Sequence, residues 1–416
     1  MAEAFKFIHA SDLHLDRPMQ GLPEVPASIK KTIANAPYVA AERIFDLAVA
    51  ERVDFVLLAG DILDIEQGGC RPAAFLLSQF ERLAEKNIQV FWCGGEVDHP
   101  ERWPAAVDLP QNVVLFCSTI VEESIAMRRG VPLATIVGSG FDPRRKTSAD
   151  FLVEETAPFP IGLTFGPFEP SALTSKHFRY WAIGGQHRAF CVDRPHETYT
   201  TWIVGSGTPQ GRAPHEIGTF GCQLVTVDVG GAVRVKFQPV DSVRWVPQSL
   251  EIAENASVDQ LKTALTERAL QLVNDNPDET LLVSWQVTAT GEYRPQWRRY
   301  EQCEEVLHWL RREFCSSGDG GLWSVDFRSD PPTSLPQGWL EEDTILGDYL
   351  RAIARYQSDP SLNLALHEYL PPTVHEDKLL AAARIIGADR QSILAAANMT
   401  GIEYLAAQRE APAAPR

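Results

Sequence analysis

The sequence predicts an α/β protein in which a layered N-terminal domain is followed by a smaller α/β unit and a helical C-terminal region. Short apolar runs alternate with helix-patterned segments through the first 245 residues or so, which predicts strands and helices in alternation. Polar clusters follow directly on the first three of these runs. The length of 416 residues is more than one hydrophobic core usually organises, so we expect two or three domains.

The alternation begins close to the N-terminus. Residues 5–10, 55–59 and 88–92 are strand-like, and residues 39–51 and 72–86 between them have a helical pattern. Further strands are predicted at 113–116, 135–137, 181–183 and 201–204. A hairpin around Gly230 and Gly231 joins the strand-like runs 224–227 and 233–237.

The segment 241–247 predicts a domain boundary. Beyond it, residues 249–252 and 280–287 are strand-like, whereas 258–273 and 303–314 are helix-patterned. A proline-rich linker is predicted at 331–336, and the chain after it is helix-patterned up to an Ala/Pro tail. The predicted parts are therefore an N-terminal domain (1–245), a small α/β capping domain (246–332), a helical C-terminal region (333–410) and a disordered tail (411–416).

The composition is that of a globular protein, with 44% hydrophobic and 22% charged residues. We find no apolar run of about 18 residues that could span a membrane. The N-terminus lacks the basic start and the long apolar stretch of a signal peptide. The seven cysteines are scattered without a C-x-x-C pair, which predicts reduced thiols. Together these features predict a cytoplasmic protein without a membrane partner.

The formal net charge of −17 argues against a broad electrostatic grip on nucleic acid, since Lys and Arg supply most of the non-specific affinity for phosphates. A local basic strip is still compatible with this charge. Arg128, Arg129, Arg144 and Arg145 are candidate DNA contacts, although short charge runs are usually a solvated face.

Three polar clusters mark a candidate metal site. Asp12 and His14 follow the first predicted strand, Asp61 follows the second, and residues 94–98 follow the third. Ligands of open α/β sheets gather at the carboxyl ends of the strands. A single D-x-H could be a turn-capping Asp beside a surface His, but successive clusters at three strand ends favour a metal.

Three sequence motifs carry a resemblance to a known family. Residues 7–15 (FIHASDLHL), 58–64 (LAGDILD) and 204–212 (VGSGTPQGR) resemble motifs of the SbcD-type DNA repair exonucleases, which belong to the calcineurin-like metallophosphoesterases. Glu216, Gly218 and the segment 243–245 extend the resemblance, which covers about residues 5–246. It implies a layered β-sandwich flanked by helices.

The resemblance also implies the ligands of a first metal. In that family the first ion is held by two Asp and two His residues, whose positions here are Asp12, His14, Asp61 and His187. All four expected ligands are present. This carboxylate–imidazole set predicts about one divalent metal per chain, with manganese expected first and iron or zinc as alternatives.

The positions of a second metal depart from the family. Its Asn and two His ligands are replaced by Glu96, Phe165 (or Thr164, in a loose register) and Gly185, and the position of the catalytic acid is Val97. Two metals about 3.5–4 Å apart clamp both oxygens of an in-line displacement, and valine cannot donate a proton. Glu96 could serve as an oxygen ligand. The neighbouring Asp98 is predicted to lie outside the metal-ligand set, so that replacing it should leave the ion bound.

The sequence leaves several functions open. One is a slow phosphoesterase or nuclease with a degenerate second metal site, and another is a non-cleaving scaffold that keeps a structural metal. A third is a fully active exonuclease with rearranged ligands. The four retained ligands argue against free drift, whereas the changes at Val97 and Gly185 argue against efficient hydrolysis. DNA ends, an SbcC-like coiled-coil ATPase and a second copy of the chain are the candidate partners.

Overall fold

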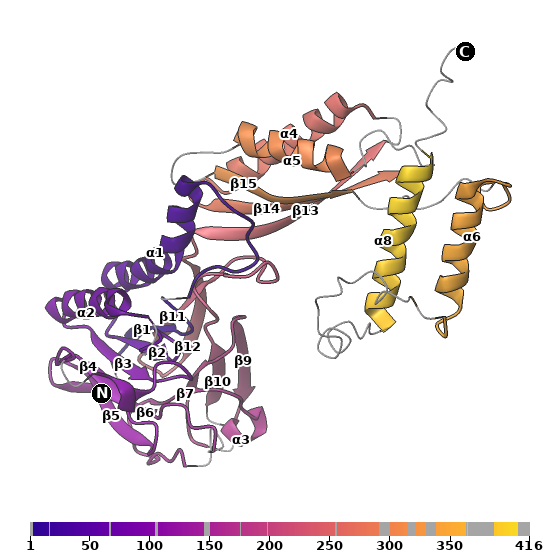
Figure 1. Cartoon of the computed structure of the whole chain (residues 1–416). Coiled ribbons are helices and arrows are strands. Elements are labelled where there is room, and N and C mark those ends of the chain that lie inside the picture. Colours follow the sequence, from indigo (N-terminus) through magenta and orange to yellow (C-terminus); the bar gives the residue numbers. More distant parts are fainter. Residues whose placement is uncertain are drawn as a thin grey trace. The chain divides into compact units, whose positions relative to one another are not determined.

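The computed structural model describes most of the chain, and Figure 1 traces its elements. The described residues are 3–15, 17–65, 68–104, 107–144, 150–174, 176–197, 199–253, 256–290, 300–314, 321–329, 338–362, 364 and 387–406. The chain divides into two compact units. The first comprises Met1–Val246, Leu272–Val283 and Phe314–Val325, and the second comprises Pro247–Gln271, Ser284–Glu313 and Asp326–Arg416.

The first unit contains two six-stranded sheets. The first sheet has the order β12-β11-β1-β2-β3-β4, and β1 to β4 run parallel while β11 and β12 are antiparallel to their neighbours. Its strands are β1 (Phe5–Ala10), β2 (Phe55–Ala59), β3 (Gln89–Cys93), β4 (Val113–Phe116), β11 (Gly221–Val227) and β12 (Val233–Pro239). The helices α1 (Ala27–Glu51) and α2 (Cys70–Glu85) cover its outer face (Figure 1).

The second sheet has the order β5-β6-β7-β8-β10-β9, in which β6, β7, β8 and β10 are parallel. Its strands are β5 (Glu122–Arg128), β6 (Val131–Gly138), β7 (Pro160–Phe165), β8 (Tyr180–Gly184), β9 (Phe190–Pro195) and β10 (Thr200–Gly205). On its outer face Leu173 of the short helix α3 (Pro170–Thr174) packs with Phe151 and Trp181.

An aromatic layer joins the inner faces of the two sheets. Phe7 of β1 stacks on Phe55 of β2 with ring centroids 4.9 Å apart, and it meets Tyr180 of β8 edge-on at 5.1 Å. Alternate residues of each strand point to opposite faces, so the other set on β1 and β2, such as Ile8 and Leu58, packs under the helices. The predicted layered β-sandwich flanked by helices is confirmed.

Several elements differ from the sequence prediction. Helix α1 begins at Ala27 instead of residue 39, and it carries Pro37 in its interior. Strands β5 and β9 were not predicted; both lie at an edge of their sheet and expose much of their length, so their sequences lack an apolar run. Strand β15 was also missed.

The rest of the chain contains a three-stranded sheet and four helices among the described residues. The sheet has the order β13-β14-β15. Its elements are β13 (Val243–Ala253), β14 (Thr280–Thr290) and β15 (Gly321–Ser329), and the helices are α4 (Val258–Asp275), α5 (Tyr300–Phe314), α6 (Ile345–Ser358) and α8 (Gly387–Ala406). Strand β13 runs through the division at Val246, so the domain limits stay a prediction.

The C-terminal helices form a small core of their own. Leu346 and Leu350 of α6 are buried and pack with Ile402 of α8, as expected for a helix that buries one apolar stripe. The predicted linker at 331–336 and the predicted tail at 411–416 lie outside the described residues. Of the helices that the structure describes, none is both long and apolar enough to cross a membrane.

Candidate metal centre

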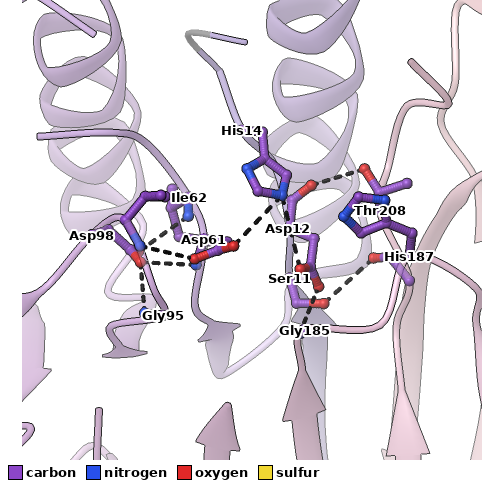
Figure 2. A network of polar contacts seen from close by, with 12 residues as sticks. Ser11, Asp12, His14, Asp61, Ile62, Gly95, Asp98, Gly185, His187 and Thr208 are labelled. Atoms are coloured by element: carbon purple, nitrogen blue, oxygen red, sulfur yellow. Dashed lines mark hydrogen bonds and ion pairs between the residues drawn. The ribbon is translucent and has the colours of Figure 1, made fainter. Parts of the chain in front are cut away.

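The predicted ligands lie where strands of both sheets end. The loop after β1 is held against the loop after β2, because Asp12 N–H donates to Gly60 O (2.9 Å) and His14 N–H donates to Asp61 O (3.0 Å). From the second sheet, Gly185 N–H donates to Asp12 Oδ2 (3.0 Å) and the Thr208 hydroxyl donates to Asp12 O (2.8 Å). These bonds fix Asp12 between the two sheets (Figure 2).

Three of the predicted ligands have an unusual backbone. Asp12, His14 and Asp61 adopt positive φ angles of 55°, 43° and 54°. This left-handed region is disfavoured for residues other than glycine, and such strain is kept where the surrounding structure requires a particular side-chain direction. The backbone at these strand ends therefore directs the three side chains toward one another.

The structure brings the four predicted ligands together. Asp12, His14 and His187 each offer a ligand atom, and these atoms lie within 4.8 Å of one another. Asp61 adjoins this group through His14, whose Nε2 is 3.7 Å from Asp61 Oδ2 (Figure 2). Two carboxylates and two imidazoles form a donor set that suits manganese, iron or zinc.

Unpaired ligand atoms test whether these residues fit a metal. Asp12 Oδ1 and His14 Nε2 are buried and lie 4.0 Å apart, and neither has a hydrogen-bond partner among the described residues. Buried polar atoms are nearly always paired, because an unpaired one loses its hydration without compensation. A cation between them would satisfy both, so the residues fit a metal ion.

The protonation states also favour a cation. Burial, together with the nearby charges of Arg212 and Arg17, lowers the pKa of His14 to about 2, so its imidazole is neutral and free to bind a metal. Burial raises the pKa of Asp61 to about 7, and the neighbouring Asp98 carboxylate adds to this shift. Burial also raises the pKa of Asp12. Without a cation, the charged carboxylates are destabilised here.

Glu216 positions the fourth ligand. Its Oε1 lies 2.5 Å from His187 Nδ1, and its Oε2 accepts the backbone N–H groups of Arg212 (2.5 Å) and Ala213 (3.1 Å). Burial opposes ionisation, but the hydrogen bonds from His187 and Arg212 lower the pKa of Glu216 to about 2. A carboxylate that takes Nδ1–H leaves Nε2 free for the metal. Glu216 belongs to a sequence motif, but the motif alone did not predict its contact with His187.

Asp98 anchors the loops after β2 and β3. Its buried carboxylate accepts hydrogen bonds from the backbone N–H groups of Asp61 (2.8 Å), Ile62 (3.1 Å) and Gly95 (2.6 Å), and from Trp92 Nε1 (2.9 Å). From the sequence, Asp98 was predicted to lie outside the metal-ligand set and to be dispensable for the ion. Since it holds the backbone of Asp61, we now expect its loss to disturb the site as well as the fold.

An aromatic ring fills the place beside Asp61. A Cβ atom on Gly60 would lie 2.4 Å from the ring of Phe165, and one on Gly95 would lie 2.9 Å from it. Phe165 is 6% exposed and meets Phe141 edge-on at 5.6 Å. The ring of Phe165 therefore packs against these glycines beside Asp61.

The other altered positions offer few atoms that could bind a metal ion beside Asp61. Gly185 has a positive φ of 86° and contributes only its N–H, to Asp12. Val97 N–H donates to Asp61 Oδ1 (3.2 Å), and its side chain is apolar. Glu96 is exposed and lines a cavity of about 270 Å³ together with Phe165. Glu96 is thus the one altered position with a side chain that could bind a cation.

Among the candidate DNA contacts, Arg128 lies away from this site. Arg128 donates from Nε and Nη2 to the carboxylate of Asp54, both at 2.6 Å. Asp54 precedes β2 whereas Asp61 follows it, so Arg128 lies at the far end of that strand. Arg129 is in the turn after β5, Arg144 N–H donates to Asp142, and Arg145 lies outside the described residues. Their role in DNA binding stays a prediction.

Comparisons with known proteins agree with this site. Residues 5–181 match the family model of the calcineurin-like phosphoesterases. The uncharacterized metallophosphoesterase YhaO of Bacillus subtilis (strain 168) is 32% identical over 263 residues, which are 60% of this chain and 63% of that protein. The chain thus spans less than two thirds of this relative.

A likeness to a solved structure is weaker. The protein TT1561 of Thermus thermophilus covers 56% of this chain and 99% of its own, with 14% identity and a TM-score of 0.34, which is too low to establish a shared fold. The family match and the relative, together with the geometry of the site, lead to one identification. The N-terminal part of this chain carries a calcineurin-like metallophosphoesterase domain, of a family that uses divalent metals.

Proposed function

We propose that the protein binds phosphate esters at a single divalent metal and hydrolyses phosphodiesters weakly or not at all. The observation that carries this proposal is the ring of Phe165, which packs against Gly60 and Gly95 beside Asp61. A second ion that shared Asp61 would need polar ligands on that side. The ring supplies none, and among the altered positions only Glu96, on the cavity that it lines together with Phe165, carries a side-chain oxygen.

The chemistry of the remaining half-site supports binding over turnover. An ion held by Asp12, His14, Asp61 and His187 would act as a Lewis acid on one phosphate oxygen. The chain offers no acid at position 97 to protonate a leaving oxygen, a role worth about 10²–10⁴-fold in rate. With a single ion, the attacking and leaving oxygens would not both be held by a cation. Binding is therefore the stronger function of this geometry.

The finer assignment follows the resemblance. We propose a degenerate member of the SbcD-type group, with manganese as the first choice of metal. Partners in this proposal are DNA ends, an SbcC-like coiled-coil ATPase or a second copy of the chain. The net charge of −17 makes a long polyanion a poor ligand for the isolated chain.

Restoring the lost positions tests the proposal. The combined variant Glu96→Asn, Val97→His, Phe165→His and Gly185→His should raise manganese-dependent hydrolysis of a phosphodiester such as bis(p-nitrophenyl) phosphate by about 100-fold or more. Val97→His alone should raise it less than about tenfold, because the second ion would still lack its ligands. Gly185 has a positive φ, so thermal unfolding must confirm that the variant folds.

A high rate in the unmodified protein would refute the proposal. Hydrolysis at about 1–10³ per second is typical of enzymes. If the unaltered chain reaches that range with manganese, or if the combined variant folds and binds metal without any gain, the altered positions do not explain the activity.

A further inference from the structure

A second cavity opens beside His187. It has a volume of about 520 Å³ and is lined by residues of both sheets, from β9 and the loop after β10 (Thr200–Gly205) on one side and from β11 and β12 on the other. Pockets for small molecules usually measure about 300–1,000 Å³. The cavity is therefore large enough for one organic group next to a phosphate held at the metal centre.

Three aromatic rings form much of its wall. Each lies against a glycine, where a Cβ atom would collide with it: the distance would be 2.2 Å for Phe190 on Gly205 and 2.7 Å for Phe220 on Gly211. Phe237 lies similarly against Gly221, at 3.0 Å. The glycines let the rings sit close to the backbone, which keeps them out of the cavity. The wall suits a flat, apolar face, since aromatic rings stack on such surfaces.

One buried polar side chain also lines the cavity. Gln223 is only 4% exposed as a residue, and its side chain lines the cavity. Its amide offers both a donor and an acceptor, so it matches the edge of a ring that carries both.

We propose that this cavity binds the heteroaromatic ring of a phosphate ester, as the base of a single nucleotide. The phosphate lies at Asp12, His14 and His187, the ring faces Phe237, and Gln223 pairs with the ring edge. Arg188, an exposed cavity residue next to His187 in sequence, adds positive charge near the phosphate. This inference rests on the proposed function and names its ligand class. A single nucleotide also agrees with the net charge of −17, which opposes longer polyanions.

Calorimetry of the full chain loaded with manganese tests the inference. The probes are the four 5′-ribonucleoside monophosphates, ribose 5-phosphate and inorganic phosphate. At least one nucleotide should bind about tenfold more tightly than ribose 5-phosphate, because base–aromatic contacts add affinity. Gln223→Leu should remove that advantage and leave the affinity for ribose 5-phosphate unchanged. Gln238→Leu, on β12 but outside this cavity, is the matched control.

A second variant tests the inference independently, in case Gln223→Leu does not fold. Cys191 is exposed and lines the cavity, so Cys191→Trp should fill it without removing a core residue. It should abolish the preference for nucleotides and retain binding of inorganic phosphate. If both variants fold and the preference persists, the cavity is not the base site.

The outcomes separate this inference from the proposed function. Equal affinity for every nucleotide and ribose 5-phosphate would overturn the cavity proposal and leave the metal site intact. If no phosphate compound binds, the proposed function fails. In that case free nucleosides decide: binding that Gln223→Leu abolishes supports the cavity, and absence of binding overturns it.

Discussion

The region around Asp61 has two halves, which differ in whether their buried polar atoms have hydrogen-bond partners. Around Asp12 and His14, buried ligand atoms have no hydrogen-bond partner among the described residues, and the backbone is strained. Around Phe165, the neighbouring half has an aromatic ring packed against Gly60 and Gly95 where a further ligand on that side of Asp61 would lie, and Glu96 lies beside it on a cavity of about 270 Å³. The first half requires a cation to compensate its buried groups, whereas the second is complete without one.

This difference agrees with the proposed one-metal site. The four residues that would hold the first ion are all present. Their supporting carboxylates, Asp98 and Glu216, are also in place. On the other side of Asp61, the ring of Phe165 packs against Gly60 and Gly95. These features support the proposal of a single metal ion.

The largest expected effect follows from removing a ligand of the first half. His14→Ala should reduce manganese affinity by about 100-fold or more, because it deletes a buried donor at the centre of the cluster. Phe165→Leu, in the other half, should leave the ion bound. Equilibrium dialysis measures both, with His177→Ala as the control at an exposed histidine. Equal losses in the two halves would remove the distinction between them.

Replacing the anchor between the halves should act on stability. Asp98→Asn places an amide where four N–H donors converge on a carboxylate, so the free energy of unfolding should fall by about 3 kcal/mol. Urea unfolding of the metal-free protein gives the change, and Asp108→Asn at an exposed position is the control. A change below about 0.5 kcal/mol would mean that the carboxylate does not hold these loops.

A smaller effect is expected from the residue that orients His187. Glu216→Gln keeps the shape of the side chain but loses the charge, and should lower metal affinity about 10- to 100-fold. The control is Glu197→Gln at an exposed position. Unchanged affinity in Glu216→Gln would show that His187 needs no such support.

The smallest effect is a dependence on pH. Since the pKa of Asp61 is raised to about 7, its carboxyl group binds a proton below that pH in the metal-free protein. Metal binding must displace this proton, so Asp61 should make the affinity fall about tenfold per pH unit below pH 7 and level off above it. His14, with its pKa lowered to about 2, should add nothing to this slope. Asp61→Asn should make the curve shallower by one proton, and an unaltered slope would exclude Asp61 as the source.

The sequence predicted the parts of this picture that depend on local pattern. Asp12, His14 and Asp61 directly follow strands whose apolar runs are plain, so their convergence at one sheet edge could be expected. Contacts between residues that are far apart in the sequence could not be predicted from local patterns. Glu216 reaches His187 across 29 residues, and Arg128 reaches Asp54 across 74. The resemblance identified Phe165 as a changed position, but only the packing shows that its ring fills the space beside Asp61.

The metal content of the protein tests the central claim most directly. The full chain, purified without chelator and dialysed against manganese, can be measured by inductively coupled plasma mass spectrometry. A half-site made of Asp12, His14, Asp61 and His187 predicts about one tightly bound ion per chain, and about none in His14→Ala. Two tightly bound ions in the unaltered protein would contradict the account, because the second would have to bind where the ring of Phe165 now packs.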